Sequence, residues 1–321
     1  MTVCNARAAG MAAWFLLPAL VLAGCGAGTP AGDPGDGAGA PRTSPALAAA
    51  EAGWRSERRE ALLAEDGWTS LVGLHWLELR AHYVGSDPTS GIRLALGPPR
   101  LGLIQQEAGR VWFTPEKGVD VLLDDAPVQG RVELRDAAGP EPPELRFAEG
   151  RGRLSLITRG ARRALRVKHA DAPARTGFGT IDHWPVDAGW TIEARFEPHP
   201  AGKTIEIASI TGGIDPMPNP GALAFSRDGA DYRLETLDDG SGGLFIVFAD
   251  RTNGLGSYGA GRYLDASVAD AGGRVMLNFN RAYNPPCAFT DFATCPLPPP
   301  ENRLDLAVTA GEKAYVKPSG S

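Results

Sequence analysis

The stretch RVMLNFNRAYNPPCAFTDFATCPLPPPENRL, residues Arg274–Leu304, decides how the second half of the chain folds. Its apolar residues at positions 275, 277 and 279 share one face, which is the period-2 pattern of a half-buried strand. A loop of about twenty residues with two cysteines and six prolines follows, and we expect a strand to resume at Arg303. Loops this long inside a compact domain are uncommon and usually either functional or disordered. Because prolines and aromatic residues restrict this loop, we interpret it as ordered and as the best candidate site.

Polar side chains flank the loop on both sides, and we expect the two groups to meet at one end of the sheet if the flanking strands pair. Arginine forks bind carboxylate or phosphate, amides orient a ligand, and a carboxyl or phenol group can move protons. We therefore predict a pocket for a small anionic ligand on the 280–303 loop. The predicted ligand-binding residues are Asn280, Arg281, Tyr283, Asn284, Asn302 and Arg303, and the candidate catalytic residues of the loop are Glu301 and Tyr283.

A structural interpretation of the same residues stays open. A proline-rich loop lacks the hydrogen bonds of a strand ladder, so its backbone needs polar side chains as partners. In that case Arg281 and Glu301 would form a structural ion pair.

The first 25 residues predict a lipoprotein signal peptide. Arg7 supplies the positive charge, Met11–Leu22 form a short apolar core, and the ending Leu22–Cys25 (LAGC) resembles the bacterial lipobox. That resemblance implies lipidation of Cys25, with acyl chains such as palmitate, and an extracytoplasmic location on a bacterial membrane (the outer membrane if the cell has two). A plain cleaved signal peptide is the alternative. Residues 26–45, rich in Gly, Ala and Pro, predict a flexible tether.

Two cysteines remain in the mature chain once Cys4 leaves with the signal peptide and Cys25 carries lipid. In an oxidising compartment, Cys287 and Cys295 favour a disulfide. The alternatives are a metal site, for which the C-x7-C spacing is unsuitable, a cysteine nucleophile, or inert thiols. We predict no metal and no cofactor. The formal charge of -6 becomes -7 without Arg7, and with no long single-sign run this argues against nucleic acid as a partner.

Ahead of the β regions, Ser44–Pro45 predicts the N-terminus of a helix that runs to about Glu65. Its apolar face carries Leu47, Ala50, Trp54, Ala61 and Leu62, and we place Arg55, Arg58, Arg59 and Glu60 largely off that face.

Strand patterns dominate from Trp68 onward, with turn signals at short intervals. We predict a mainly β protein with one N-terminal helix and two packed, sandwich- or barrel-like β regions. The first domain spans 46–175 and the second, which carries the 280–303 loop, spans 176–317. The run Val84–Leu94 (VGSDPTSGIRL) resembles the opening of a forkhead-associated β-sandwich. Ser86 stands where those domains have their phosphate-gripping arginine, so the resemblance implies the sandwich without phosphopeptide binding.

An irregular polar segment, residues 167–187, links the two β regions, and pockets favour such junctions. It carries His169 and His183. If it faces the 280–303 loop, His183 is the best candidate for a catalytic acid or base. Elsewhere His75 is isolated, and each histidine also fits a packing role.

Four stretches together resemble a bacterial domain-of-unknown-function family, numbered 1684. They are Asp66–Leu74 (DGWTSLVGL), Val84–Pro88 (VGSDP), Phe279–Thr290 (FNRAYNPPCAFT) and Cys295–Leu304 (CPLPPPENRL). The resemblance spans roughly Leu47–Lys313 and implies no settled activity. Asn278 and Asp291 depart from the residues that the family often has there, which are Asp and Pro. Relatives without an export signal carry the same two cysteines, so a functional thiol pair stays an alternative to the disulfide.

These observations predict a lipid-anchored protein that binds a small anionic ligand at the 280–303 loop. The first alternative is a hydrolase-type enzyme with Glu301 or His183 as general base and Arg281 and Tyr283 stabilising the developing charge. A protein-interaction module is the second alternative.

Overall fold

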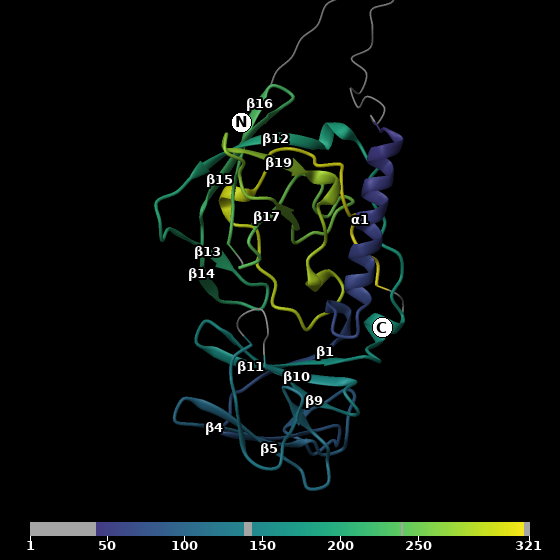
Figure 1. Ribbon diagram of the computed structural model, residues 1–321, viewed down its shortest axis with the longest axis vertical. Helices are drawn as coiled ribbons and strands as arrows, with labels where there is room; N and C mark the ends of the chain where they lie inside the picture. The colour runs from purple at the N-terminus through teal and green to yellow at the C-terminus, as the bar shows by residue number, and fades with distance from the viewer. Residues whose placement is uncertain (1–42, 138–142, 239, 318–321) are drawn as a thin grey trace, which may run out of the picture. The chain divides into compact units, whose positions relative to one another are not determined.

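The fold is known from a computed structural model that describes residues 43–137, 143–238 and 240–317. Cys25, the predicted signal peptide and the predicted tether up to residue 42 lie outside these ranges. Helix α1 (Pro45–Leu63) begins where the sequence predicted (Figure 1). The Ser44 hydroxyl oxygen accepts a hydrogen bond from the Leu47 backbone N–H (3.1 Å), and Pro45 supplies a helical φ. No helix in the described ranges is long and apolar enough to cross a membrane.

The face of α1 that contacts the body is more polar than predicted. Glu51 and Leu62 are each only 1% exposed, and Arg55 and Arg58, which share their side of the helix, are half-buried. The prediction that Arg55 and Arg58 lie off the buried face is therefore wrong. Polarity was a poor guide because Arg58 bonds Glu312 and the Asn284 carbonyl, while one nitrogen of Arg55 reaches the Trp184 carbonyl (3.5 Å).

The first β region is a sandwich of two sheets, as predicted. The five-stranded sheet has the order β3-β2-β4-β5-β8 and the six-stranded sheet the order β1-β11-β10-β9-β6-β7. The strands of the first sheet are β2 (Ala81–Gly85), β3 (Ile92–Arg93), β4 (Gly102–Glu107), β5 (Arg110–Pro115) and β8 (Val132–Leu134). Those of the second are β1 (Leu71–Trp76), β6 (Leu122–Leu123), β7 (Ala126–Pro127), β9 (Leu145–Phe147), β10 (Gly152–Arg159) and β11 (Arg162–His169).

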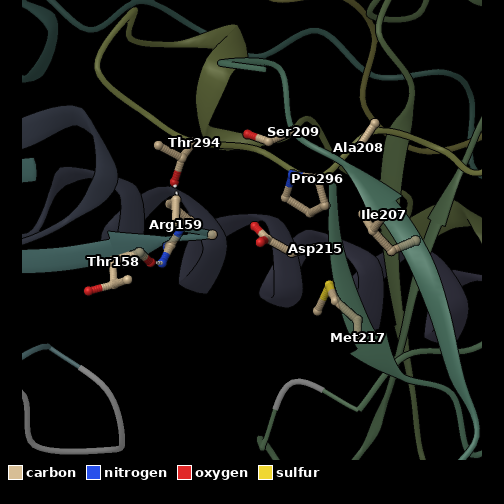
Figure 2. Close-up of a pocket in the computed structure, with 10 residues that line it drawn as sticks. Thr158, Arg159, Ile207, Ala208, Ser209, Asp215, Met217, Thr294 and Pro296 are labelled. Atoms are coloured by element: carbon tan, nitrogen blue, oxygen red, sulfur yellow. Dashed lines mark hydrogen bonds between the residues drawn. The ribbon is translucent and has the colours of Figure 1, made fainter. Parts of the chain in front are cut away.

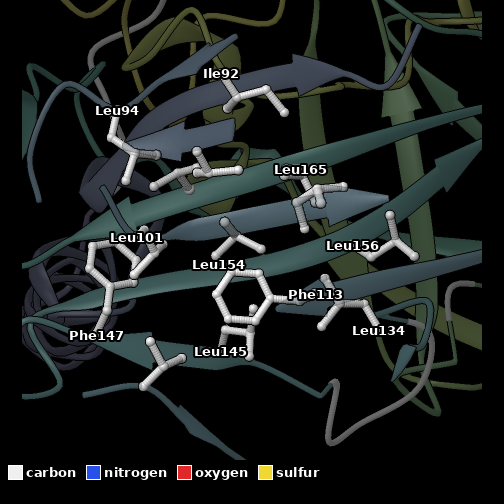
Figure 3. Close-up of a cluster of buried hydrophobic side chains, with 14 of the residues drawn as sticks. Ile92, Leu94, Leu101, Phe113, Leu134, Leu145, Phe147, Leu154, Leu156 and Leu165 are labelled. Carbon is white, nitrogen blue, oxygen red and sulfur yellow. The ribbon is translucent and has the colours of Figure 1, made fainter. Parts of the chain in front are cut away.

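The core of this sandwich forms where alternate residues of both sheets face each other (Figure 3). Ile104 and Phe113 from one sheet, and Leu154 and Leu165 from the other, are each at most 1% exposed. Burying each of these side chains contributes about 1.5–3 kcal/mol.

The second β region contains a four-stranded sheet of order β16-β15-β12-β19 and two hairpins, β13–β14 and β17–β18. Its strands are β12 (Thr191–Pro198), β13 (Thr204–Ala208), β14 (Ile214–Pro218), β15 (Gly221–Arg227), β16 (Ala230–Glu235), β17 (Leu244–Phe248), β18 (Arg262–Ala266) and β19 (Arg274–Asn278). A short helix, α2 (Pro173–Thr176), precedes this region. A second core gathers around Phe248 and Phe279, whose rings meet edge to face.

The chain beyond β19 is less regular than predicted. The condition under which the two polar groups of the loop would meet, pairing of the flanking strands, is not fulfilled, because β19 pairs with β12. Residues after Arg303 form no strand; Arg303 makes a single bridge to Ala249, and the Leu304 N–H donates to the Ala249 carbonyl (2.8 Å). Three short 3₁₀ turns shape the loop: η3 (Phe279–Arg281), η4 (Pro286–Ala288) and η5 (Pro300–Asn302).

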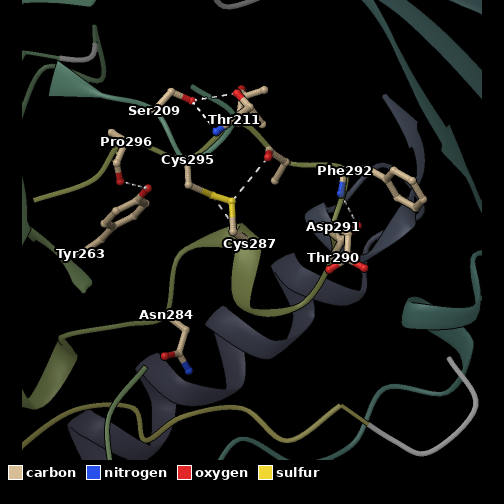
Figure 4. Close-up of a disulfide and its surroundings, with 12 residues drawn as sticks. Ser209, Thr211, Tyr263, Asn284, Cys287, Thr290, Asp291, Phe292, Cys295 and Pro296 are labelled. Atoms are coloured by element: carbon tan, nitrogen blue, oxygen red, sulfur yellow. Dashed lines mark hydrogen bonds between the residues drawn. A yellow bond between two sulfur atoms is a disulfide. The ribbon is translucent and has the colours of Figure 1, made fainter. Parts of the chain in front are cut away.

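The predicted disulfide between Cys287 and Cys295 is present (Figure 4). It closes the middle of the loop, and the Cys287 backbone N–H lies 3.1 Å from the Cys295 Sγ. Cys295 itself is buried, in a small core with Val247 and Tyr263. The metal site, the cysteine nucleophile and the inert or functional thiols all required free thiols at Cys287 and Cys295. The disulfide-bonded structure does not have them.

Candidate functional site

The polar residues of the 280–303 loop do not converge on one pocket. The three amides make local structural contacts: Asn280 exchanges hydrogen bonds with the backbone of Asp187, and Asn302 bonds the backbone of Glu235 and Val247. Asn284 donates to the Lys313 carbonyl (2.7 Å). These buried amides bond backbone groups of other segments and so fix the loop to the rest of the second β region.

The charged residues of the loop are also separated. Arg281 bonds both carboxylate oxygens of Glu51 (3.1 and 3.2 Å), so the predicted Arg281–Glu301 pair is wrong. Glu301 lines a different cavity of about 430 Å³, together with Lys203 and Glu235. The Arg303 side chain is exposed. Sequence proximity failed as a guide here because the two ends of the loop bridge to different segments, Tyr283 to Tyr263 and Arg303 to Ala249.

A different cavity joins His183 to the start of the loop. It has a volume of about 400 Å³ and lies between α1 and the linker, and we call it the helix–linker cavity. Its charged and titratable lining residues are Arg55, Arg58, Arg59, His183 and Glu312, and its apolar lining residues include Ala52 and Ile181. Arg55, Arg58 and Arg59 follow one another at i, i+3 and i+4, the spacing that places side chains on one side of a helix.

Residues 311–313 hold the linker against the loop and so form one wall of the cavity. The Glu312 N–H donates to the Ala282 carbonyl (2.7 Å), and the Trp184 N–H donates to the Gly311 carbonyl (2.9 Å). Gly311 has a φ of 80°, and a Cβ there would lie 2.3 Å from the Ala282 carbonyl oxygen. Only glycine allows this close approach of the two backbones.

A fully buried arginine fixes the segment that precedes this wall. Arg262 pairs with Asp250 (2.8 Å), and both side chains are 0% exposed. Its Nη2 also donates to the Val308 carbonyl (2.9 Å), and its Nη1 donates to the Ala310 and Glu312 carbonyls. The guanidinium thereby supplies hydrogen bonds to three carbonyls that no strand satisfies.

The Glu312 carboxylate connects the helix to the loop. One of its oxygens lies 3.2 Å from the Arg58 Nε, and the other accepts the backbone N–H of Asn284 (2.7 Å). Arg58 also donates to the Asn284 carbonyl (2.9 Å) and stacks over the Tyr283 ring at 4.4 Å. Burial raises the pKa of Glu312, while Arg58 and the Asn284 N–H act in the opposite direction.

Two polar atoms of the cavity are buried without a hydrogen-bond partner among the described residues, the Nε of Arg55 and the Nε2 of His183. Burial lowers the pKa of Arg55, and the carboxylates of Glu51 and Glu312 oppose this shift. Burial, followed by the positive charge of Arg55, lowers the pKa of His183 to about 4. His183 is therefore a neutral imidazole at pH 7 beside a cluster of guanidinium groups.

Of the predicted catalytic residues, only His183 lines the helix–linker cavity. Tyr283 contacts its edge through Arg58, and its hydroxyl donates to Asp265 (3.2 Å). The sequence analysis missed the three arginines and Glu312 as site residues. The arginine spacing was a usable signal, but polar helix residues are more often solvated, and nothing around Glu312 in the sequence marks it. Within the described ranges, no group of His, Cys, Asp and Glu is arranged to hold a metal ion.

The class of protein follows from the fold and from a family match. Residues 176–313 match the family described as "Protein of unknown function (DUF1684)", and the chain belongs to this family, as the sequence predicted. The match includes His183 and Glu312 but starts after α1, so it is shorter than the predicted span from Leu47.

Two solved structures are similar to parts of the chain. An uncharacterised protein from Haloarcula marismortui, solved by solution NMR, is 32% identical over 43% of this chain and 78% of that one, with a TM-score of 0.36. The N-terminal FHA domain of EssC, a component of the bacterial Type VII secretion apparatus, is 14% identical over 30% of this chain and 46% of that one, with a TM-score of 0.24. No curated protein matches the chain.

Replacing Glu312 with Gln tests its connecting role. Breaking a buried ion pair costs about 3–5 kcal/mol, and we expect about 2–3 kcal/mol here because Arg58 keeps some contact with solvent. Urea unfolding measures this loss. The same substitution at exposed Glu301 is the control and should change the free energy of unfolding by less than about 0.5 kcal/mol. Equal effects at the two positions would contradict the assignment.

The lowered pKa of His183 predicts a pH dependence of stability. Between its ordinary value near 6.5 and about 4, the unfolded chain binds more protons at this histidine than the folded chain does. Its contribution is therefore complete above pH 6.5 and is lost as the pH falls toward 4. Unfolding at pH 7 and pH 4 should show that His183→Gln loses about 1–2 kcal/mol less than wild type over this interval. The raised pKa of Glu312 has the opposite effect on stability, but it is the same in wild type and variant. The difference between their losses of unfolding free energy therefore reports His183. Equal losses in the two proteins would contradict the burial of its imidazole.

Proposed function

We propose that the helix–linker cavity binds a small anion with an apolar body, such as a carboxylate on a short hydrocarbon chain. The observation that carries this proposal is the excess of guanidinium groups in the lining. Arg55, Arg58 and Arg59 face one carboxylate, Glu312, whose negative charge is itself disfavoured by burial. A bound oxyanion would compensate this excess and accept hydrogen bonds that the cavity leaves unmade.

The Nε of Arg55 is the best-placed donor for such a ligand. It is buried without a partner, whereas Arg58 is engaged by Glu312, and Arg59 donates to the Gly179 carbonyl (2.7 Å). A buried donor without an acceptor costs free energy, which a ligand oxygen would recover. Ala52 and Ile181 favour a hydrocarbon portion beside the charged group.

The first test measures hexanoate binding to the purified full chain by calorimetry, with hexanamide as the neutral match. We expect hexanoate to bind and hexanamide to bind at least tenfold more weakly, because only the carboxylate pairs with the arginines. Arg55→Gln should lose at least tenfold in hexanoate affinity. Arg93→Gln is the control, since Arg93 is exposed on β3, away from the cavity lining. Equal affinities of the two variants, or of the two ligands, would contradict the proposal.

Hydrolysis is the second candidate function, and the state of His183 favours it. A neutral imidazole with an unpartnered Nε2 has the form of a general base that could activate water against an ester. Glu301 is not retained as the base because it lines a separate cavity. Assays with p-nitrophenyl hexanoate separate the two functions: an enzyme loses turnover in His183→Gln while hexanoate affinity persists, whereas a binding protein shows no turnover in either form.

We also propose that the protein is exported and held at a bacterial membrane by lipid on Cys25. The Cys287–Cys295 disulfide supports export, because disulfides persist mainly in oxidising compartments. When the chain is expressed in a bacterium, wild type should enter the detergent phase of a phase-partition assay and Cys25→Ser the aqueous phase. The same partition of both proteins would contradict lipidation.

A further inference from the structure

A second cavity, of about 410 Å³, lies between the two β regions (Figure 2). Residues 158–160 at the end of β10 form one side, and strands β13 and β14 form another. Thr294 and Pro296 of the disulfide-closed loop complete the lining. We call it the inter-sheet cavity, and it shares no lining residue with the helix–linker cavity.

Arg159 lines this cavity and Arg166 lies beside it, where it contacts the lining residue Thr294; among the described residues neither has a carboxylate partner. The Arg159 Nε donates to the Thr294 hydroxyl (3.0 Å), and Arg166 reaches the same hydroxyl with its Nη2 (3.5 Å). Neither guanidinium forms an ion pair with any residue in the described ranges, and the Nε of Arg166 is buried without a hydrogen-bond partner there. Two like charges that share one neutral hydroxyl repel each other and leave donors unused.

The register of the sheet explains why the arginines meet. Arg159 pairs with Arg162 across β10 and β11, and Ser155 pairs with Arg166, so all of these side chains share one face. The opposite face supplies Leu154 and Leu165 to the sandwich core. The arginine face therefore looks toward the second β region.

Burial makes this concentration of charge costly. Burial and the neighbouring charge of Arg159 together lower the pKa of Arg166 to about 10. The Trp68 ring lies 5.4 Å from the Arg166 guanidinium and stabilises it only weakly compared with an anion. An oxyanion beside Thr294 would compensate both arginines.

The rest of the lining limits what kind of anion fits. Asp215, from β14, lines the same cavity, and Figure 2 shows its carboxylate in the gap between Arg159 and the apolar side chains of Met217 and Pro296. A purely anionic ligand would be repelled by this carboxylate, whereas a ligand that also carries an ammonium group would pair with it. Arg159, Arg166 and Asp215 sum to one positive charge, which matches a phosphate monoester with one ammonium group.

We propose that the inter-sheet cavity binds a phosphate ester that carries an amine, with the phosphate at Arg159, Arg166 and Thr294 and the ammonium at Asp215. Phosphate is favoured over carboxylate because two adjacent guanidinium groups match its greater negative charge and its three acceptor oxygens. This ligand chemistry occurs both in free phosphoethanolamine and in the headgroup of a phospholipid. The proposal does not depend on the function proposed for the helix–linker cavity.

The test is calorimetric titration of the purified full chain with O-phosphoethanolamine, and with ethyl phosphate as the match that lacks the amine. We expect O-phosphoethanolamine to bind at least tenfold more tightly than ethyl phosphate. Arg159→Gln should weaken O-phosphoethanolamine binding at least tenfold, and Asp215→Asn should abolish the preference over ethyl phosphate. Asp215 is half-buried and forms no ion pair among the described residues, so this second variant is expected to fold and to remain informative if Arg159→Gln does not.

Two controls separate this site from its surroundings. Arg162→Gln removes a guanidinium on the same sheet face that stacks on Trp76 at 3.9 Å and does not line the cavity. Arg93→Gln removes an exposed guanidinium on β3 that lines neither cavity. Both should bind O-phosphoethanolamine like wild type. Unchanged binding in Arg159→Gln and Asp215→Asn, or no binding by wild type at millimolar ligand, would overturn the proposal.

A third ligand distinguishes a lipid headgroup from a free metabolite as the source of the bound phosphate ester. Glycerophosphoethanolamine has the diester form of a lipid headgroup, whereas O-phosphoethanolamine is the free monoester. Tighter binding of the diester would support the proposal with a lipid-derived ligand, and tighter binding of the monoester would support it with a free metabolite.

Discussion

The buried Glu312 carboxylate is the contact on which the candidate site depends. It holds Arg58 of α1 and the backbone of Asn284 at once, and the chain on either side of it joins the linker to the loop. A buried carboxylate is tolerated only when its oxygens find strong donors. Here those donors come from a helix and a loop, Arg58 and the Asn284 N–H, and Arg262 separately holds the backbone carbonyl of Glu312. The charge therefore requires the helix and the loop to be in place. The helix–linker cavity is the space left around this junction.

Local sequence patterns predicted the elements of the fold well because their causes are local. The Ser44–Pro45 cap, the alternating strands of the first sandwich and the Cys287–Cys295 bridge each depend on residues close together in the chain or on the composition of one segment. The strand expected after Arg303 did not form. Its apolar residues do alternate, but its backbone makes isolated hydrogen bonds instead of a strand ladder. The Leu304 N–H donates to the Ala249 carbonyl, and the Val308 carbonyl accepts from the Arg262 side chain. No short-range pattern in the sequence reveals these partners.

The site was harder to predict because its partners are remote in sequence. Arg58 and Glu312 are 254 residues apart, and Arg281 and Glu51 are 230 apart. The polar density of the 280–303 loop was correctly noticed, but its amides bond the backbone of segments outside the loop, at Asp187, Glu235, Val247 and Lys313, rather than the loop's own backbone. The sequence analysis named His183 only on the condition that the linker faces the loop; the structure places it beside Glu312, which bonds Asn284 at the start of the loop.

The most direct test of the account is an NMR titration of the His183 imidazole with and without saturating hexanoate. The positive charge of Arg55 contributes to holding the pKa of His183 near 4 in the free protein. A carboxylate bound beside Arg55 would compensate that charge, so the account predicts that the pKa of His183 rises when hexanoate is present. A pKa that is unchanged at saturation would contradict it, because the anion would then lie elsewhere.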